Sequence, residues 1–512
     1  MTDPAAKDFV ILGGGTAGWM AACLLADQWG DRGAKVTLIE SKDIGIIGVG
    51  EGSTPQLKAF FDRLGIAESE WMPACDATYK NGIGFHGWSD RPGYESYFHP
   101  FPTPLDNHSA AQFFYNTRAR RTGRDVVAHP DRFFLPALLA ATNKAPIAPQ
   151  NFPFDPTYGY HFDAHKVGAF LAGHATGNLG VRHIEGRIDT VERDENGDIS
   201  GLIAEDGSRI TGDFFLDCSG FRAVLFNGAL EEPFLSFSDN LFNDSAVVMP
   251  TARAEQAPLP SQTKATALSA GWVWDIPLTT RTGNGYVYSS DHIDAAAAEL
   301  ELRQHLGVDD QGEARHLKMR VGRVRNSWSH NALAIGLSQG FLEPLEATAL
   351  HIVMATVEQF IESFEAGAFT PQHRDSFNAD IAARYEGIRD YIICHYKVNR
   401  REDVDGIDYW AASRGNHNLS DDLKSILTCW YTGGDLSAEI ANLGISKFYS
   451  PISWHSLLAG YGTFPDDTKI SPPGDDIVKH DMDEIGVFLD RCALNFTDHA
   501  SALSMSIPKA HI

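Results

Sequence analysis

The first forty residues place apolar runs around one glycine turn, in the order of a nucleotide-binding α/β unit. Residues 9–12 (Phe-Val-Ile-Leu) are continuously apolar, as is typical of a parallel strand that is buried on both faces. Residues 19–26 follow as small and apolar residues that predict a helix, and residues 36–39 predict a second strand that ends at Glu40. The pattern therefore predicts a strand, a helix and a strand at the start of a parallel sheet.

The period of the apolar positions changes further along the chain. Residues 85–160 are rich in Pro, Gly and aromatic residues, which favours irregular structure over a pocket. Residues 184–217 alternate between apolar and polar with a turn at Asn196-Gly197, so we expect a β-meander that returns to the first sheet. Residues 243–290 predict longer strands, and a helical period dominates from about residue 345 onward.

Composition narrows the class of protein. With 512 residues, 43% of them apolar and 21% charged, the chain is globular and too long for one ordinary core. Its net charge of -25 repels phosphate backbones and anionic lipid, which argues against nucleic acid and membrane partners. Six cysteines without C-x-x-C spacing indicate reduced cytosolic thiols rather than disulfides or a zinc site. Residues 9–26 are uncharged, but three glycines interrupt them and no basic region precedes them, so we expect a cytoplasmic protein.

The glycine turn matches G-x-G-x-x-G through Gly13, Gly15 and Gly18. The first glycine permits a tight turn, the second lets the backbone approach a pyrophosphate, and the third lets the helix pack closely on the strand. The helix N-terminus offers free N–H groups to the phosphates, and Glu40 is placed to accept hydrogen bonds from a ribose. The predicted cofactor residues of this motif are Gly13, Gly14, Gly15, Thr16, Ala17, Gly18 and Glu40.

This fingerprint alone does not separate FAD from NAD. Its position at the start of the chain, and the later segment 213–220 in which an apolar strand ends in Asp-Cys-Ser-Gly, both favour FAD. No second G-x-G-x-x-G follows a predicted strand, so the sequence shows no evident NAD(P)H site. A flavoenzyme of this kind must receive reduced flavin or electrons from another protein.

Residues 271–277 read Gly-Trp-Val-Trp-Asp-Ile-Pro. Trp272 and Trp274 lie on one face if this segment is a strand, and core packing is the ordinary explanation for such a pair. The whole string, which ends at Pro277, resembles the G-W-x-W-x-I-P signature of flavin-dependent halogenases. The likeness to the tryptophan-halogenase branch of that family runs from residue 8 to about 415. The further segments that carry it are residues 13–21, 47–51, 161–165, 217–220 and 341–346.

The resemblance implies both a fold and an activity. The fold is α/β, with an FAD-binding Rossmann-type domain of the GR2, monooxygenase-like kind, an inserted β-rich region and a mostly helical C-terminal part. Residues 1–350 would form the discontinuous FAD-binding core, with inserted strands and loops at 85–290, and residues 351–512 the substrate-binding part. The enzyme would use FADH2, oxygen and chloride or bromide to make hypohalous acid and halogenate an electron-rich, indole-like aromatic. A separate NAD(P)H-dependent flavin reductase and a homodimer are also implied.

Lys80 and Glu346 match the catalytic residues of the family. A lysine at this position would hydrogen-bond hypohalous acid or form a haloamine, whereas most lysines are solvated surface charges. Glu346 would stabilise the cationic intermediate and help to remove the ring proton, although it or Glu343 could simply be a carboxylate at a helix start. The resemblance favours Glu346.

The resemblance also assigns residues to the flavin, the halide and the substrate. Backbone N–H groups at a helix start suit an anion, and Thr348 and Ala349 match the residues that hold the halide. His99 and Phe101 match residues that sandwich the indole ring, and Phe448 and Tyr449 are expected to close the pocket. The further flavin contacts are Val49, Gly50, Leu337 and Leu350.

Two departures from the family pattern bear on specificity. The family usually has Ser and Gly where this chain has Ala347 and Ala349, so the balance between chloride and bromide is expected to differ. Residues 434–448 do not reproduce the tyrosine-rich stretch that grips the amino-acid backbone of tryptophan. We therefore expect indole, a substituted indole or a larger indole-containing molecule rather than free tryptophan.

Three alternatives remain open at this point. A flavin aromatic monooxygenase would share the FAD fold but would need no Lys80, Glu346 or G-W-x-W-x-I-P string. A flavin-binding or redox-sensing protein could have lost its halide site at Ala347 and Ala349. His161 and His165 have a spacing that can bind zinc, but no third ligand is suggested nearby, so we expect a structural role and no metal.

Overall fold

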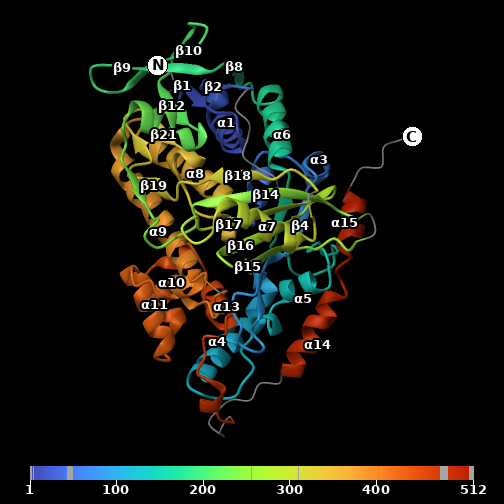
Figure 1. Ribbon diagram of the computed structural model, residues 1–512. Helices are drawn as coiled ribbons and strands as arrows, with labels where there is room; N and C mark the ends of the chain where they lie inside the picture. The colour runs from blue at the N-terminus through green and yellow to red at the C-terminus, as the bar shows by residue number, and fades with distance from the viewer. Residues whose placement is uncertain are drawn as a thin grey trace. The chain divides into compact units, whose positions relative to one another are not determined.

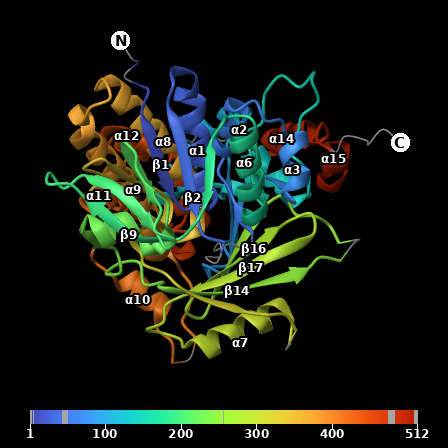
Figure 2. The same cartoon turned by 90° about the horizontal axis from the view of Figure 1, so that it is seen from above.

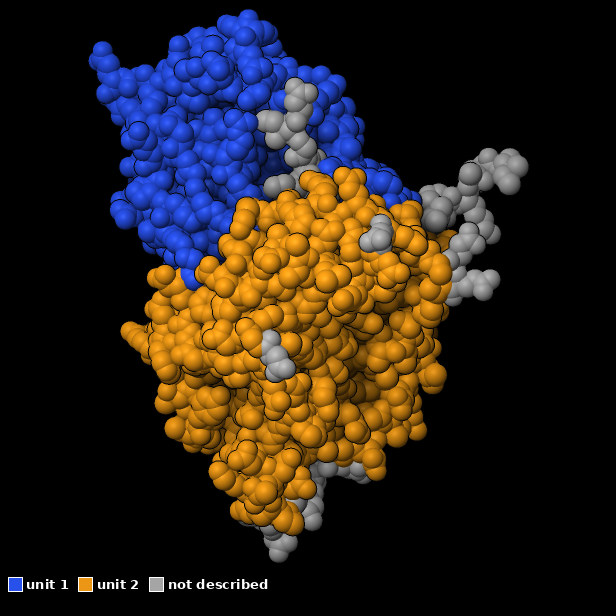
Figure 3. All heavy atoms as spheres, in the orientation of Figure 1, with its two compact units in different colours: residues 1–77, 162–238, 319–386 blue, residues 78–161, 239–318, 387–512 orange. Residues whose placement is uncertain are grey.

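The computed structural model describes residues 3, 5–42, 50–254, 257–309, 311–404, 406–472 and 482–506. The chain divides into two compact units, which Figure 3 colours separately. Unit 1 contains residues 1–77, 162–238 and 319–386, and unit 2 contains residues 78–161, 239–318 and 387–512. Residue 350, at which the predicted FAD-binding core ends, lies in helix α8 (Ala349–Ala366) of unit 1. That residues 351–512 bind substrate stays a prediction.

The main sheet of unit 1 has six strands in the order β20-β21-β12-β1-β2-β8. All pairs are parallel except β20 with β21. Figure 1 shows β1 and β2 beside α1. The strand, helix and strand predicted at the start of the chain are confirmed. The strands are β1 (Asp8–Leu12), β2 (Lys35–Glu40), β8 (Arg182–Glu185), β12 (Phe214–Asp217), β20 (Trp328–Ser329) and β21 (Ala332–Ala334).

Helices and two smaller sheets complete unit 1. The predicted meander is confirmed, because β9, β10 and β11 form an antiparallel sheet and β12 then joins the main sheet. Its strands are β9 (Ile188–Arg193), β10 (Ile199–Ala204) and β11 (Arg209–Ile210), and those of the other small sheet are β13 (Phe234–Ser236), β19 (Gly322–Val324) and β22 (Gly340–Phe341). The helices are α1 (Thr16–Trp29), α2 (Gln56–Arg63), α3 (Glu68–Ala74), α6 (Ala164–Gly177), α8 and the first half of α9 (Arg374–Val398).

Unit 2 is built on a seven-stranded sheet in the order β18-β14-β17-β16-β15-β5-β6, in which only β5 and β15 pair in parallel. Figure 2 shows β14, β16 and β17 with α7 along one face, where Tyr286 and Leu302 share an apolar core. The long strands predicted for residues 243–290 are confirmed. The strands are β5 (Gly82–His86), β6 (Ser96–Pro100), β14 (Ser245–Ala252), β15 (Thr263–Leu268), β16 (Gly271–Pro277), β17 (Arg281–Tyr288) and β18 (Arg315–Lys318).

The helices of unit 2 lie mostly in its C-terminal part, as the helical period predicted. The prediction of irregular structure for residues 85–160 was wrong, because this segment contains β6 and the helices α4 (Asn107–Arg121) and α5 (Leu135–Ala141). The other helices are α7 (Ala295–Leu306), α10 (Tyr409–Gly415), α11 (Asp421–Tyr431), α12 (Leu436–Asn442), α13 (Pro451–Gly460), α14 (Met482–Ala493) and α15 (His499–Ser506). Among all the helices described, none is long and apolar enough to cross a membrane.

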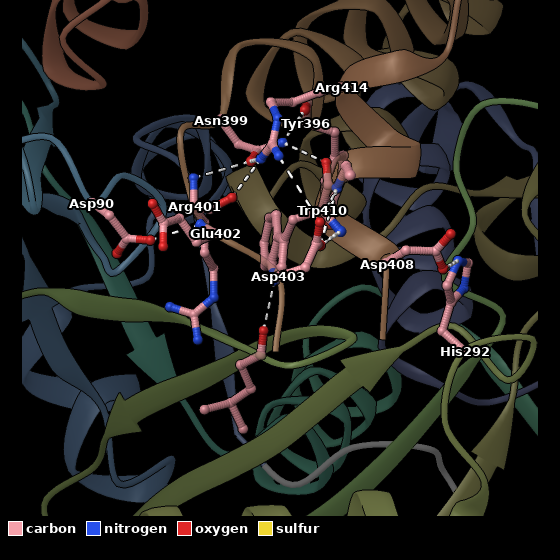
Figure 4. Close-up of polar contacts among 12 residues, drawn as sticks. Asp90, His292, Tyr396, Asn399, Arg401, Glu402, Asp403, Asp408, Trp410 and Arg414 are labelled. Carbon is pink, nitrogen blue, oxygen red and sulfur yellow. Dashed lines mark hydrogen bonds and ion pairs between the residues drawn. The ribbon is translucent and has the colours of Figure 1, made fainter. Parts of the chain in front are cut away.

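The chain after α9 is tied to the seven-stranded sheet by a polar network (Figure 4). The indole nitrogen of Trp410 donates to the carbonyl of Leu268, at the end of β15, over 2.8 Å. Arg414 donates to the side-chain oxygen of Asn399 over 2.7 Å, and Arg401 donates to the carbonyl of Gly87 over 2.9 Å. These bonds fix the C-terminal end of α9 within unit 2.

Candidate flavin and lysine sites

The glycine turn after β1 has the geometry that its motif predicts. Gly13 has a φ of +115°, and a Cβ at this residue would lie 2.2 Å from the carbonyl oxygen of Cys218. A Cβ on Gly18 would lie 2.0 Å from the carbonyl oxygen of Gly13. Because both contacts are with backbone atoms that cannot move aside, only glycine allows the tight turn and the close packing of α1.

The start of α1 leaves open space beside Gly15. Gly15 is the N-cap of the helix, and no atom lies within 4 Å of the position where its Cβ would be. The first turn contains no acidic side chain, so the positive end of the helix dipole is not neutralised there. The hydroxyl of Thr16 donates to the carbonyl of Ala164 over 3.2 Å. Backbone N–H groups are therefore the groups of this turn that would hold a pyrophosphate.

Glu40 lies directly over the turn. A Cβ on Gly14 would be 1.8 Å from one carboxylate oxygen of Glu40. This close approach favours glycine at residue 14, a position that the G-x-G-x-x-G motif leaves open. The other carboxylate oxygen lies 2.9 Å from Nε2 of His183 on β8. Sequence reasoning missed His183, since it lies far along the chain in a strand of ordinary composition.

Asp217 connects the end of β12 to the segment that contains Leu337. Its buried carboxylate accepts hydrogen bonds from the hydroxyl of Ser338 over 3.0 Å and from the backbone N–H groups of Leu225 and Phe226 over 2.8 and 3.0 Å. Ser338 ends a short helical turn, Gly336–Ser338, whose middle residue is Leu337.

The turn that contains Leu337 also contacts the start of α1. A Cβ built on Gly336, where φ is +64°, would lie 3.0 Å from the Cβ of Ala17. Together with the bonds of Asp217, this contact brings the predicted flavin residues Leu337 and Ala17 into one region of unit 1. These contacts are within the protein, and flavin binding by the two residues stays a prediction.

The start of α8 carries the residues that were assigned to the halide. Glu346 and Thr348 are buried, Ala349 is the first residue of the helix and is exposed, and Leu350 is buried. Ala347 has a φ of +55°, a left-handed conformation that is strained for a residue with a Cβ. The chain thus turns sharply just before α8. That the first backbone N–H groups of this helix hold the halide stays a prediction.

Part of the predicted flavin-contacting loop can be placed. Val49 lies outside the described residues, and Gly50 is buried. Burial, and then the negative charge of Asp163, raise the pKa of Glu51 to about 7. This carboxyl therefore holds a proton through part of the neutral pH range.

Lys80 is wholly buried in a short strand of unit 2. Strand β4 (Thr78–Lys80) pairs antiparallel with β7 (Gly159–Phe162), so that Thr78 faces His161 and Lys80 faces Gly159. The Nζ of Lys80 lies 5.4 Å from the ring centre of Phe101. A fully buried lysine is rare, which sets Lys80 apart from a solvated surface charge.

The strand of Lys80 is hydrogen-bonded to the tryptophan motif. The hydroxyl of Thr78 donates to the carbonyl of Pro277 over 2.7 Å, so it accepts from the Nδ1–H of His161 over 2.9 Å. Nε2 of His161 then accepts from the hydroxyl of Thr263 over 3.0 Å. Burial, and next the charge of Lys80, hold the pKa of His161 well below its ordinary value. His161 is therefore neutral and hydrogen-bonded on both ring nitrogens within the protein.

Trp272 and Trp274 lie on one face of β16, as predicted, with ring centres 6.1 Å apart. Trp272 is buried, and Trp274 packs over Gly285, where a Cβ would lie 2.1 Å from the indole ring. The pair belongs to the core of unit 2, and Pro277 is the residue of the motif that reaches the strand of Lys80.

Two of the predicted substrate residues, His99 and Tyr449, contact one tyrosine that sequence reasoning did not single out. Tyr391 stacks on Tyr449 with ring centres 3.6 Å apart, and its ring lies 5.9 Å from His99 and 4.8 Å from Trp454. Tyr391 is the centre of an aromatic cluster built by β6, α9 and α13. The only sequence signal was the high aromatic content of the helical tail.

The other two predicted substrate residues are also placed in unit 2. The backbone N–H of Phe101 donates to the carbonyl of Asn81, next to Lys80, over 3.0 Å. The ring of Phe448 packs on α9 at Gly387, where a Cβ would lie 2.3 Å from the ring. The structure therefore brings Lys80 together with Phe101, and it places His99 and Tyr449 each against Tyr391.

The predicted residues divide between the two units. Glu346, Thr348 and Ala349 lie with the glycine turn in unit 1, whereas Lys80 and the predicted substrate residues lie in unit 2. That Glu346 acts together with Lys80 stays a prediction. Within the described ranges, no group of three His, Cys, Asp or Glu side chains is arranged to hold a metal ion.

Comparisons with known proteins agree on one family. The family model described as tryptophan halogenase matches residues 8–472. Tryptophan 6-halogenase SttH of Streptomyces toxytricini is 38% identical over 429 residues, which cover 78% of this chain and 79% of the relative. Tryptophan 7-halogenase RebH of Lentzea aerocolonigenes is 34% identical over 482 residues, which cover 89% of this chain and 90% of the relative.

Solved structures support the same assignment. BrvH, a flavin-dependent halogenase from Brevundimonas sp. BAL3, has a TM-score of 0.83 at 30% identity and covers 99% of this chain and 100% of its own. The expected fold class is confirmed, and the family match displaces the alternative of an aromatic monooxygenase. The chain belongs to the tryptophan halogenase family of flavin-dependent enzymes.

Proposed function

We propose that this enzyme halogenates indole or a larger indole derivative with FADH2, oxygen and chloride or bromide. The observation that carries the proposal is the wholly buried Lys80, set against Phe101 in a chain of this family. Reduced FAD and oxygen would supply the oxidising power that converts halide into hypohalous acid. Since the sequence shows no second nucleotide motif, a separate NAD(P)H-dependent reductase would supply the reduced flavin.

Unit 1 would bind the cofactor and the halide. The backbone around Gly15 would hold the pyrophosphate, because the space beside it is open and the helix dipole favours an anion. Glu40, oriented by His183, would accept a hydrogen bond from the ribose. The backbone N–H groups of Thr348 and Ala349, at the start of α8, would hold chloride or bromide.

Unit 2 would carry out the transfer. The Lys80 amine would hydrogen-bond hypohalous acid or form a haloamine, and its burial would keep the oxidant away from bulk water. The aromatic rings of His99, Phe101 and Tyr449 would hold the indole by stacking. A ring carbon would form the carbon–halogen bond and lose its proton, for which the family resemblance assigns Glu346 as the base, while the oxygen of the acid would leave as water.

The substrate class is proposed from what residues 434–448 contain. This segment forms α12 and the short turn Ile445–Lys447, and it includes no tyrosine before Tyr449. SttH and RebH are named as tryptophan halogenases, and the similar structure MibH is described as a lanthipeptide tryptophan halogenase. The absence of a tyrosine-rich grip supports an indole without a free amino-acid backbone.

The proposal is tested with purified protein, FAD, a separate flavin reductase, indole and bromide. We expect brominated indole by mass spectrometry, and neither product nor rapid NADPH consumption when the reductase is omitted. NADPH consumption by the protein alone with a hydroxylated product would instead indicate a monooxygenase. Reduced FAD without any halogenated product from a panel of indoles would indicate a lost halide site.

The same assay addresses halide preference. Because Ala347 and Ala349 replace the usual Ser and Gly of the family, we expect different initial rates in chloride and in bromide. Ala349→Gly is the matched variant, since it changes only the exposed first residue of α8. Equal chloride and bromide rates in the wild type would contradict this part of the proposal.

A further inference from the structure

Strand β4 is held by a side chain from the C-terminal helix α15. The backbone N–H of Tyr79, the residue before Lys80, donates to Nε2 of His499 over 3.0 Å. Nδ1 of His499 in turn donates to the carbonyl of Leu259 over 3.1 Å. The two bonds require a neutral imidazole with its proton on Nδ1, since Nε2 must accept.

The bond to His499 takes the place of a neighbouring strand. All residues of β4 are buried, and a buried backbone N–H that lacks a partner is strongly unfavourable. Just beyond Lys80, the backbone N–H of Asn81 donates to the carbonyl of Ser261 over 2.8 Å. The backbone is therefore fixed immediately before and after Lys80.

Helix α15 is firmly anchored next to this strand. The backbone N–H of His499 donates to the carbonyl of Asn143 over 2.9 Å. The ammonium of Lys144 donates to the carbonyls of Ala493 and Phe496 over 2.9 and 2.6 Å. His499 is wholly buried, and it lies beyond residue 472, where the match to the family model ends.

We propose that His499 is a positioning residue for Lys80, because its imidazole fixes the backbone at Tyr79 and so determines where the lysine amine lies. The inference rests on the proposed function, in which Lys80 retains hypohalous acid. Without the bond, β4 would keep its pairing with β7 but lose the backbone anchor next to Lys80, the amine would move, and part of the oxidant would escape into solution.

The electrostatic surroundings support this role. Burial lowers the pKa of His499 to about 4, and Arg253 acts in the same direction, while Asp498 and the carbonyls of Leu259 and Pro260 oppose it. At neutral pH the imidazole is therefore uncharged, and Nε2 is free of a proton and able to accept from Tyr79.

Substitutions of His499 by side chains of different length and polarity test the proposal. The side-chain oxygen of His499→Gln extends to the position of Nε2, whereas His499→Asn is too short to reach the N–H of Tyr79. His499→Leu removes both hydrogen bonds, and Met505→Ala changes an exposed residue on the same helix and serves as control. Each variant is assayed with reductase, indole, bromide and a soluble diketone that traps hypobromous acid.

We expect the leucine and asparagine variants to lose about tenfold in kcat, as for one buried hydrogen bond. The KM for indole should stay within about twofold, and the share of bromine found on the trap should rise. The glutamine variant should recover most of the rate and retain the oxidant, and Met505→Ala should match the wild type. Wild-type rates and trapping in the leucine variant, or equal behaviour of the asparagine and glutamine variants, would overturn the proposal.

The activity of the wild-type enzyme distinguishes a failure of this inference from a failure of the proposed function on which it rests. If the wild type halogenates none of a panel of indoles, the proposed function fails. If the wild type is active and the glutamine and asparagine variants do not differ, only the role of His499 fails. A variant that does not fold is recognised by thermal unfolding, and the glutamine–asparagine pair, which keeps a polar side chain of similar size, still decides the question.

Discussion

The candidate flavin region of unit 1 and the lysine region of unit 2 are built in different ways. The turn, helix and acid of the flavin region lie within residues 13–40, and their contacts are dictated by glycines in one motif. The lysine region brings Thr78, His161, Thr263, Pro277 and His499 together from distant parts of the chain. A local motif can be recognised in a sequence, whereas an assembled site becomes visible only once the fold is known.

This difference between a local motif and an assembled site predicts that substitutions act by different means in the two regions. In the flavin region, a substitution should act through the space that one side chain fills. In the lysine region, it should act through a hydrogen-bonded partner far away in sequence. The following predictions test this contrast, beginning with the largest expected effect.

Substitution of two glycines of the same turn should weaken flavin binding in both cases but should differ in its effect on stability. Gly13→Val forces a left-handed residue against the carbonyl of Cys218, so we expect a loss of about 3 kcal/mol in the free energy of unfolding and no flavin binding. The methyl group added in Gly15→Ala would contact no other atom, and residue 15 has an ordinary φ of -70°. The free energy of unfolding of this variant should therefore change by less than about 0.5 kcal/mol. Its flavin affinity should nevertheless fall at least about tenfold, because the methyl group occupies the space meant for the pyrophosphate.

Urea unfolding and quenching of flavin fluorescence measure both quantities. Unchanged flavin affinity in Gly15→Ala would show that the open space does not hold the cofactor. That result would leave the turn as a structural feature only.

Acid should weaken the lysine region through His499. The pKa of His499 is about 4 in the folded chain against about 6.5 when unfolded. The stability that comes from keeping this imidazole neutral is therefore fully present above pH 6.5, and it is lost as the pH falls towards 4. The full effect is on the order of 3 kcal/mol, and His161 acts with the same sign. Apparent stability measured from pH 7 to pH 4 should fall less steeply in His499→Gln than in the wild type, and parallel curves would exclude this origin.

Thr78→Val should disturb the lysine region from a distance. The substitution keeps the shape of the side chain but leaves the carbonyl of Pro277 and the Nδ1–H of His161 without this partner. We expect a loss of about 1–3 kcal/mol in stability and a lower kcat, because β4 carries Lys80. Thr142→Val, at an exposed threonine of the same unit, should be close to neutral, and equal effects of the two would contradict the network.

The smallest effect is expected at Ala347. Its φ of +55° suits glycine, so Ala347→Gly should raise the free energy of unfolding by up to about 1 kcal/mol. A rise in the thermal midpoint with unchanged flavin binding would place the strain in the turn before α8. A lower midpoint would show that the left-handed alanine is not strained.

The fold was predictable wherever the period of the apolar residues was clear. The strand, helix and strand around the glycine turn, and the strand of Trp272 and Trp274, followed from spacing alone. Helix α4 was missed because Pro and Gly surround it and conceal a polar helix between them. A signal was present, since Thr103 and Asp106 form a capping box in which the Thr103 N–H donates to the Asp106 carboxylate over 2.7 Å.

The candidate sites were predictable only in part. The glycine motif and the family resemblance were sufficient to single out Gly13, Gly18 and Lys80. Neither pattern pointed to Tyr391 or His499, because these residues belong to helices of ordinary composition and approach the site only through tertiary packing.

The most direct test is mass spectrometry of indole after incubation with the enzyme, FAD, a flavin reductase and bromide, compared with Lys80→Ala. The wild type should give the paired mass peaks of a bromine isotope pattern, and the variant should give none while it still binds flavin. A variant that brominates indole at the wild-type rate would contradict the claim that the buried Lys80 delivers the halogen.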